Sequence, residues 1–208
     1  IAGLLLGIVT GFFGVFVVQR KMSFLGSGIS HAAFGGVALG LLINVQPMLV
    51  AVPFSFLIAF LIILLKNKTN LGSDTAIGIL FSVAMAMGII FLSLKESYSN
   101  DANSYLFGSI LSVFPSDLLL IAVITLLVLF IAFKYWKRWA YSTFDRELAL
   151  SDRVPVTKDE YVMTLAITLV IVVSIKIVGM LLIGAYLIIP AAASRLISKS
   201  FFQMTVLS

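Results

Sequence analysis

The stretch MSFLGSGISHAAFGGVALGLL (residues 22–42) decides the fold of this chain. It is almost wholly apolar or small, and it contains His31, the single histidine of the sequence. A helix needs about 20 predominantly apolar residues to cross the hydrocarbon core of a bilayer, and this stretch is long enough. It therefore predicts a membrane-spanning helix that carries one imidazole among glycines, alanines and leucines.

The composition of the whole chain also indicates a protein that lies in a lipid bilayer. Its 208 residues are 61% hydrophobic and 11% charged, with a mean hydropathy of +1.16. Soluble domains have about 25% charged residues, so a soluble domain of this composition could not cover its surface with polar groups. The apolar runs do not alternate as the strands of a membrane barrel do. The expected fold is an all-α, polytopic transmembrane bundle, and without cysteine it holds no disulfide or thiolate metal site.

Apolar runs recur along the chain and predict about seven or eight spans in a single transmembrane domain, residues 1–208. An eighth run begins near residue 201, and we expect the sequence to be a piece of a slightly longer chain. The segment 105–114 is too short to span, so a re-entrant or interfacial segment is expected there. Pro190 is expected to kink or break the last full run. The full runs are residues 1–18, 25–44, 47–65, 74–94, 116–133, 160–175 and 177–194.

The positive charges predict the orientation of these spans. All of the 14 Lys and Arg residues except Lys95 and Lys176 fall in one set of alternate connections. Connections rich in Lys and Arg remain in the cytoplasm. Residue 1 is therefore expected outside, and the cytoplasmic connections are expected at residues 19–24, 66–73, 134–159 and 195–200.

His31 is the first candidate for function. An ionisable residue inside a span is costly and usually faces the bundle interior or a water-filled path. Imidazole binds zinc, manganese and iron ions, so His31 is a candidate on a metal-ion path. The alternative is a neutral core histidine that is hydrogen-bonded to a neighbouring helix. Ser27, one turn earlier, and Asp74, at the start of the fourth run, are weaker candidates, and Asp74 also suits a cap or a first-turn charge.

Small residues form a second pattern in the same stretch. Gly28, Ala32, Gly36 and Gly40 recur every four residues and lie on one side of the predicted helix. Such a stripe lets a neighbouring backbone approach closely in a membrane. It predicts tight helix packing and does not by itself indicate a particular function.

The long polar connection predicts a short helix near 144–154. Ser142 or Thr143 is expected to cap it, with Asp145 and Glu147 in its first turn, because helix N-termini favour such residues. Pro155 is expected to end it. The helix is either a docking element for another protein or an ordinary solvated connector.

Motifs for nucleotide and hydrolytic chemistry are absent from the sequence. It contains no GxxxxGK[ST], so we expect any ATP hydrolysis to occur in a separate chain. It also lacks GxSxG and HExxH, and an enzyme is therefore disfavoured. The net charge of +5 lies mainly in the connections between spans and does not indicate a nucleic-acid partner.

Five segments together resemble the zinc/manganese/iron permease family of bacterial ATP-binding-cassette importers. They occur in the family's order and cover nearly the whole chain. They are FVVQRKMSFLGSGISHAAFGGVALG (16–40), DTAIGILFS (74–82), SYLFGSILSV (104–113), FDRELA (144–149) and KIVGMLLIGAYLIIPAAASRL (176–196).

The resemblance implies a homodimeric permease in the bacterial plasma membrane. Two separate ATPase subunits would dock on it, and an extracytoplasmic metal-binding protein would deliver Zn²⁺, Mn²⁺ or Fe²⁺, with zinc preferred and no permanently bound cofactor. The family's coupling helix matches the segment with Phe144, Asp145, Glu147 and Ala149. Access would alternate at the dimer axis. The competing interpretations are a permease for a metal-chelate cargo and a secondary transporter or channel without an ATPase.

Two positions depart from the family pattern. His31 matches the family's histidine, but Ser27 stands where the family commonly has Asp. Arg153 stands where the coupling segment often has Gly. The first departure removes a charged ligand from the expected ion path, and the second concerns only the end of the coupling helix.

Overall fold

The computed structural model describes residues 2–69, 71–95, 106–108 and 115–208. Regular structure in this part of the chain is entirely helical, which confirms the all-α prediction. Residues 105 and 109–114 of the expected re-entrant or interfacial segment lie outside the described residues. The helices are α1 (Ala2–Gln19), α2 (Leu25–Leu42), α3 (Pro47–Lys68), α4 (Ser73–Ser93), α6 (Pro115–Phe144), α7 (Arg146–Ser151), α8 (Val156–Val178), α9 (Met180–Ile197) and α10 (Phe201–Leu207).

The long helices follow the apolar runs. By length and composition, six of them could cross a membrane, namely α2, α3, α4, α6, α8 and α9. The first run forms the apolar helix α1, of which Gly3–Gln19 is just below the length of the shortest of these six. The expected eighth helix begins at Phe201 as α10 (Phe201–Leu207).

Helix α6 corrects the expected boundary of the long connection. Residues 134–144 were expected in a loop, but α6 continues without interruption to Phe144 over 30 residues. The sequence from 116 to 144 contains neither glycine nor proline, so nothing stops the helix where the apolar run ends. The connection proper is residues 145–155, which hold α7.

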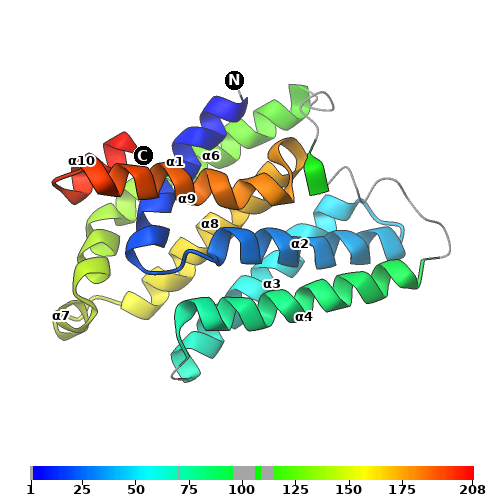
Figure 1. The fold of residues 1–208 in the computed structure, drawn as a ribbon, viewed down its shortest axis with the longest axis horizontal. Helices are drawn as coiled ribbons and strands as arrows, with labels where there is room; N and C mark the ends of the chain where they lie inside the picture. The colour runs from blue at the N-terminus through cyan, green and yellow to red at the C-terminus, as the bar shows by residue number, and fades with distance from the viewer. Residues whose placement is uncertain (1, 70, 96–105, 109–114) are drawn as a thin grey trace.

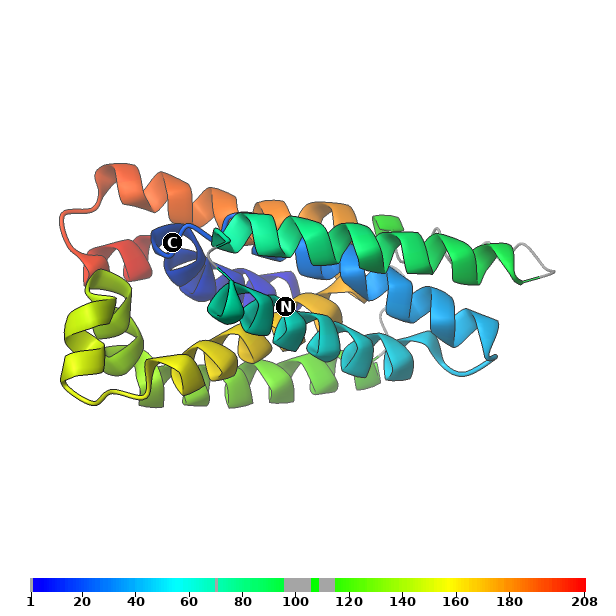
Figure 2. The same cartoon turned by 90° about the horizontal axis from the view of Figure 1, so that it is seen from below.

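Helix α2 lies at the centre of the bundle. It packs against α3, α4, α8 and α9, while α1 packs against α6, α8, α9 and α10. Figure 1 shows α9, α2 and α4 side by side toward the viewer, with α3 and α8 behind them. In Figure 2, α4 and α9 lie on one side of the molecule and α6 on the other. Small side chains suit the central position, and 78% of α2 is buried, against 22% of α4.

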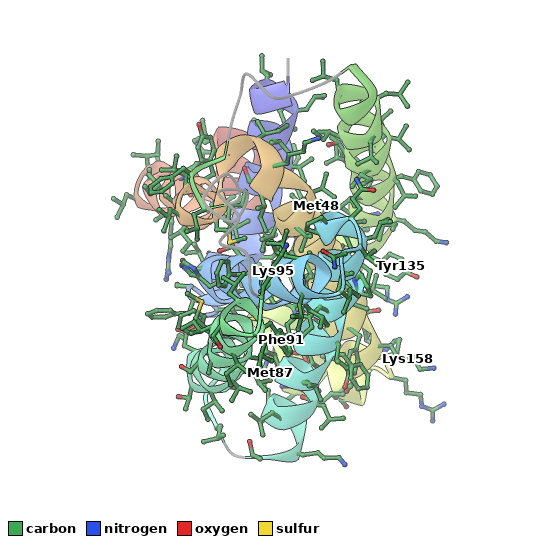
Figure 3. The ribbon with its side chains drawn as sticks, turned by 90° about the vertical axis from the view of Figure 1, so that its right-hand side faces the viewer. Met48, Met87, Phe91, Lys95, Tyr135 and Lys158 are labelled. Carbon is green, nitrogen blue, oxygen red and sulfur yellow. The ribbon has the colours of Figure 1, made fainter. Side chains whose placement is uncertain are left out.

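The basic connections gather at one end of the bundle, which we call the basic end. It comprises residues 19–24, 66–69, 71–73, 145–155 and 195–200, and it lies at the left in Figure 1. Lys95 follows α4 at the opposite end and faces the viewer in Figure 3, which looks along the bundle from that end. The segregation of charge that the sequence predicts is therefore present in space.

Two details of α8 and α9 depend on single residues. Gly179 alone separates the two helices, and its φ of 84° and ψ of 158° are accessible essentially only to glycine. The expected break at Pro190 is absent, because α9 is continuous from Met180 to Ile197. Neighbouring helices can satisfy the backbone groups that a membrane proline leaves free.

Candidate functional site

His31 lies on α2 and is half-buried. Its ring centroid is 5.5 Å from that of Phe81 on α4, with an interplanar angle of 56°. Its Nδ1 atom is buried and has no hydrogen-bond partner among the described residues. Buried polar atoms are nearly always satisfied, so an orphan imidazole nitrogen requires a water, an ion or a partner from outside this chain. The expected core histidine bonded to a neighbouring helix is not observed.

Ser27 lies one turn before His31 and faces a different neighbour. A Cβ atom added to Gly184 of α9 would lie 2.5 Å from the Ser27 Oγ atom, so this hydroxyl lies at the α2–α9 contact. Ser30 ties the same two helices, since its hydroxyl donates to the Met180 carbonyl oxygen at 3.1 Å. Ser27 and His31 thus lie on the strip of α2 between α4 and α9.

Asp74 lies near the start of α2, away from His31. Its Oδ1 atom accepts a hydrogen bond from the Phe24 backbone N–H at 3.2 Å, just before α2 begins. Phe24 and His31 are separated by about 10 Å along the axis of α2, because each helical residue rises about 1.5 Å. Asp74 therefore stabilises the start of α2, as a charge near a helix N-terminus does. Among the described residues, no three His, Asp or Glu side chains gather into a group that could hold a metal ion.

The small residues of α2 contact two helices. A Cβ atom on Gly36 would lie 2.7 Å from the Ala51 Cα atom, and one on Gly40 would lie 2.8 Å from the Pro47 Cα atom, both on α3. Gly28 instead contacts Ile77 of α4. A four-residue repeat drifts around a helix of 3.6 residues per turn, so the stripe turns from α4 toward α3 along its length. Ala32, between them, is fully buried.

The short helix α7 begins at Arg146, and Asp145 is its N-cap. The Asp145 carboxylate accepts a hydrogen bond from the Leu148 backbone N–H at 2.9 Å. The expected caps Ser142 and Thr143 are wrong, because both residues lie inside the extended α6. Glu147 is in the first turn, as expected, whereas Asp145 precedes the first turn as the N-cap.

The surface of α7 is apolar as well as charged. Phe144 just before it is 66% exposed, and Leu148 and Leu150 are each half exposed. Ala149 is fully buried against the bundle. The exposed face of α7 therefore combines apolar side chains with the carboxylates of Asp145 and Glu147.

Removing the cap tests how α7 is held. Replacing Asp145 with alanine is expected to destabilise α7 by about 1 kcal/mol, because the Leu148 N–H loses its acceptor. Hydrogen exchange of peptides covering 144–151 should accelerate roughly fivefold, the equivalent of that energy. Glu147→Ala, which removes a neighbouring carboxylate without removing a cap, should change exchange much less. Equal acceleration in the two variants would contradict the capping role.

A charged cluster beside α7 was missed by the sequence reasoning. Glu160 of α8 is buried, and its Oε1 atom lies 2.9 Å from Lys66 Nζ and 4.0 Å from an Arg20 nitrogen. Its Oε2 atom lies 3.5 Å from Arg146. The signal that could have found it is a carboxylate at the very start of the run 160–175, where a buried charge needs a partner.

Arg20 anchors the turn between α1 and α2 to the end of α6. Its guanidinium donates to Thr143 Oγ1 at 2.9 Å, to Ser142 Oγ at 3.0 Å and to the Trp139 carbonyl oxygen at 3.2 Å. Burial lowers the pKa of Arg20 from its ordinary value, and the Glu160 carboxylate acts in the opposite direction. Arginine remains protonated in proteins despite such shifts, so the cluster keeps its positive charge.

Comparison with known proteins matches this architecture over the whole chain. The chain is 32% identical to the high-affinity zinc uptake system membrane protein ZnuB of Haemophilus influenzae over 96% of its own length and 77% of that protein. It is 37% identical to the manganese import system permease protein ScaB of Streptococcus gordonii over 100% and 74% of the two chains. The solved structure of PsaBC from Streptococcus pneumoniae in complex with Fab superposes with a TM-score of 0.83 at 35% identity, covering 99% of this chain and 74% of that one.

These matches confirm the resemblance that the five sequence segments indicate. The model of the ABC 3 transport family matches residues 1–208, the full range of the helices described above. Together with the six long apolar helices, this match makes the protein a multi-pass membrane protein. The chain belongs to the ABC 3 transport family.

Proposed function

We propose that this chain is the membrane-spanning permease subunit of an ATP-driven importer of divalent metal ions, with zinc and manganese as the leading cargoes. The names of its relatives, a zinc uptake protein and a manganese import permease, support this assignment. Residues 1–208 would form one permease domain, which the family match over the same range supports. The chain would not be an enzyme, and ATP would be hydrolysed by a separate subunit.

The observation that carries the proposal is the unpartnered imidazole of His31. It lies on the central helix α2, between α4 and α9, with a buried Nδ1 atom that no described residue satisfies. A neutral imidazole can take a partly dehydrated divalent ion and release it again, since one nitrogen ligand alone binds weakly. Ser27 would contribute at most a hydroxyl, and Asp74 would act near the start of α2, where its carboxylate accepts a hydrogen bond from the Phe24 N–H.

The ATPase would dock on α7. Phe144, Asp145 and Glu147 are exposed there, and Ala149 connects the helix to the bundle. The adjoining basic end would face the cytoplasm, because Lys and Arg concentrate on that side. ATP-driven movement of the docked subunits would then reach the spans through α7.

The remaining partners follow from the same assignment. A second copy of the chain would cover part of the large apolar surface of the bundle and place the ion path at a dimer axis. An extracytoplasmic metal-binding protein would deliver the ion at the end opposite α7. The assembly would lie in the bacterial plasma membrane, which is supported by the names of the bacterial relatives, a zinc uptake system membrane protein and a manganese import permease.

The test is metal import by the assembled complex. The permease, its ATPase and its binding protein are reconstituted in lipid vesicles, and uptake is measured for zinc, manganese and iron(II). His31→Ala is expected to lower uptake and metal-stimulated ATP hydrolysis at least about tenfold, the equivalent of one lost interaction of 1.4 kcal/mol. Ser82→Ala on α4 is the matched control, because its exposed hydroxyl donates to the Gly78 carbonyl oxygen of its own helix.

The outcomes separate the candidate functions. Uptake by wild type that depends on ATP and on His31 supports the proposal and names the cargo. Uptake that persists without any ATPase indicates a secondary transporter or channel. Unchanged uptake in His31→Ala shows that the imidazole is only a packed side chain.

A further inference from the structure

The buried carboxylate of Glu160 has no role in the proposed ion path. It lies near the start of α8, and its side chain is 8% exposed. Lys66, in the last turn of α3, approaches Oε1 at 2.9 Å, and Arg20, after α1, approaches it at 4.0 Å. Arg146, the first residue of α7, approaches Oε2 at 3.5 Å. One carboxylate therefore faces cations from three separate elements.

The three contacts are unequal. The contact with Lys66 is short and hydrogen-bonded, and both side chains are largely shielded from water. The contact with Arg146 is longer, its side chain is 44% exposed, and the Oε2 atom that it faces has no hydrogen-bond partner. The Arg146 nitrogen also reaches Asn67 Oδ1 at 3.4 Å, beyond Lys66 at the end of α3. A small displacement of α7 would make or break the Arg146–Glu160 contact while the Lys66–Glu160 pair persists.

The unsatisfied Oε2 atom gives this contact its importance. A buried carboxylate oxygen without a hydrogen bond costs free energy. The cluster is therefore stabilised when Arg146 moves close enough to donate a hydrogen bond to the Oε2 atom. Because Arg146 belongs to α7 and Glu160 to α8, that gain couples the position of α7 to the spans α3 and α8. The Arg146 side chain also donates the hydrogen bond to Asn67 of α3, so this one residue connects α7 to both α3 and α8.

We propose that Glu160 is the positioning residue through which movement of α7 reaches the transmembrane helices, with Arg146 as the contact that closes and opens. This inference rests on the proposed docking of an ATPase at α7. Glu160 would act through its contacts with Lys66, Arg20 and Arg146. It acts by holding α3, α8 and the α1–α2 turn in one arrangement when Arg146 is engaged.

The experiment measures the coupling ratio, defined as metal ions imported per ATP hydrolysed. The complete importer in lipid vesicles is supplied with zinc or manganese, and both rates are recorded in the same sample. Glu160→Gln and Arg146→Ala are each expected to lower the coupling ratio at least about fivefold, which corresponds to about 1 kcal/mol. Loss of folded protein lowers both rates together and leaves the ratio unchanged, so the ratio reports coupling and not stability.

Two further variants make the test specific. Lys158→Ala removes an exposed cation from the same turn of α8, and its side chain extends outward in Figure 3, so it should keep the wild-type ratio. The double variant Glu160→Gln with Arg146→Ala should be no worse than Glu160→Gln alone. Independent, multiplying losses would mean that Arg146 acts by touching the ATPase directly, and this would overturn the proposal.

The failure of this inference can be told apart from failure of the proposed function. If wild type imports metal with a measurable ratio and both single variants keep that ratio, only the role of Glu160 is wrong. If wild type imports no metal under any condition, the proposed function is wrong and the coupling role with it. The Arg146 side chain is exposed, so Arg146→Ala is expected to fold. Its coupling ratio can then be measured even if Glu160→Gln does not fold.

Discussion

Replacing Gly36 with leucine is expected to destabilise the protein by at least about 3 kcal/mol. A Cβ atom at this position would lie 2.7 Å from the Ala51 Cα atom and 2.9 Å from the Phe54 Cβ atom of α3. The nearest obstacle is backbone, so no rotamer change relieves the clash and α3 must move away from the central helix. Thermal unfolding of the detergent-solubilised protein, followed by size-exclusion chromatography, measures the loss.

Gly78→Leu is the matched control for this prediction. Gly78 is also a helical glycine, on α4, but a Cβ atom there meets nothing within 4 Å. Leucine is a better helix former than glycine by roughly 0.5–1 kcal/mol, so this variant should be as stable as wild type or slightly more stable. If Gly36→Leu and Gly78→Leu change the stability of the protein equally, α2 and α3 do not approach each other as closely as the structure indicates.

Replacing Arg20 with alanine is expected to cost about 3 kcal/mol, because hydrogen bonds to charged groups are worth more than neutral ones. The variant removes three hydrogen bonds to the end of α6 and leaves the hydroxyls of Ser142 and Thr143 without this donor. Since Arg20 lies between α1 and α2, the turn loses its attachment to α6. The midpoint of thermal unfolding is the measurement, in the same detergent as above.

Lys137→Ala controls for the loss of a basic residue at the same end of the bundle. Lys137 is exposed on α6, where a surface substitution changes stability by less than about 0.5 kcal/mol. Arg20→Lys keeps the charge but cannot present several donors in a fixed plane, so an intermediate loss is expected. Equal stability of Arg20→Ala and Lys137→Ala would show that the observed hydrogen bonds contribute nothing.

Much of the fold could be predicted because lipid imposes its requirement locally. The run 25–44 became α2, Leu25–Leu42, and the run 47–65 became α3, Pro47–Lys68. Each span must satisfy its own backbone hydrogen bonds and present apolar side chains, and both conditions are visible in one continuous segment. The predicted helix ends were wrong where the apolar run stops, as in α6. Outside the apolar layer, only the residues of the helix itself determine where it ends.

The site was only partly predictable for a related reason. His31 was found because an ionisable group in an apolar run is conspicuous, whereas its neighbour Phe81 lies on another helix. Asp74 lies in the first turn of α4, as its sequence position predicts, and its hydrogen bond to the Phe24 N–H at the start of α2 was not predictable. Glu160 was missed because Lys66 and Arg20, its partners, are distant in the sequence.

The sequence by itself therefore determined that the chain lies in a lipid bilayer and where most of its helices lie. It also determined the end of the bundle at which positive charge gathers and the presence of one imidazole within a span. Only the tertiary structure decided that α2 is central, that the stripe from Gly28 to Gly40 turns from one neighbour to another, and that Glu160 joins α3, α7 and α8. The physical reason is the distance along the sequence over which each interaction acts. Burial in lipid and backbone hydrogen bonding act within each segment, whereas close packing and ion pairing depend on which segments meet, and a single span does not encode its neighbours.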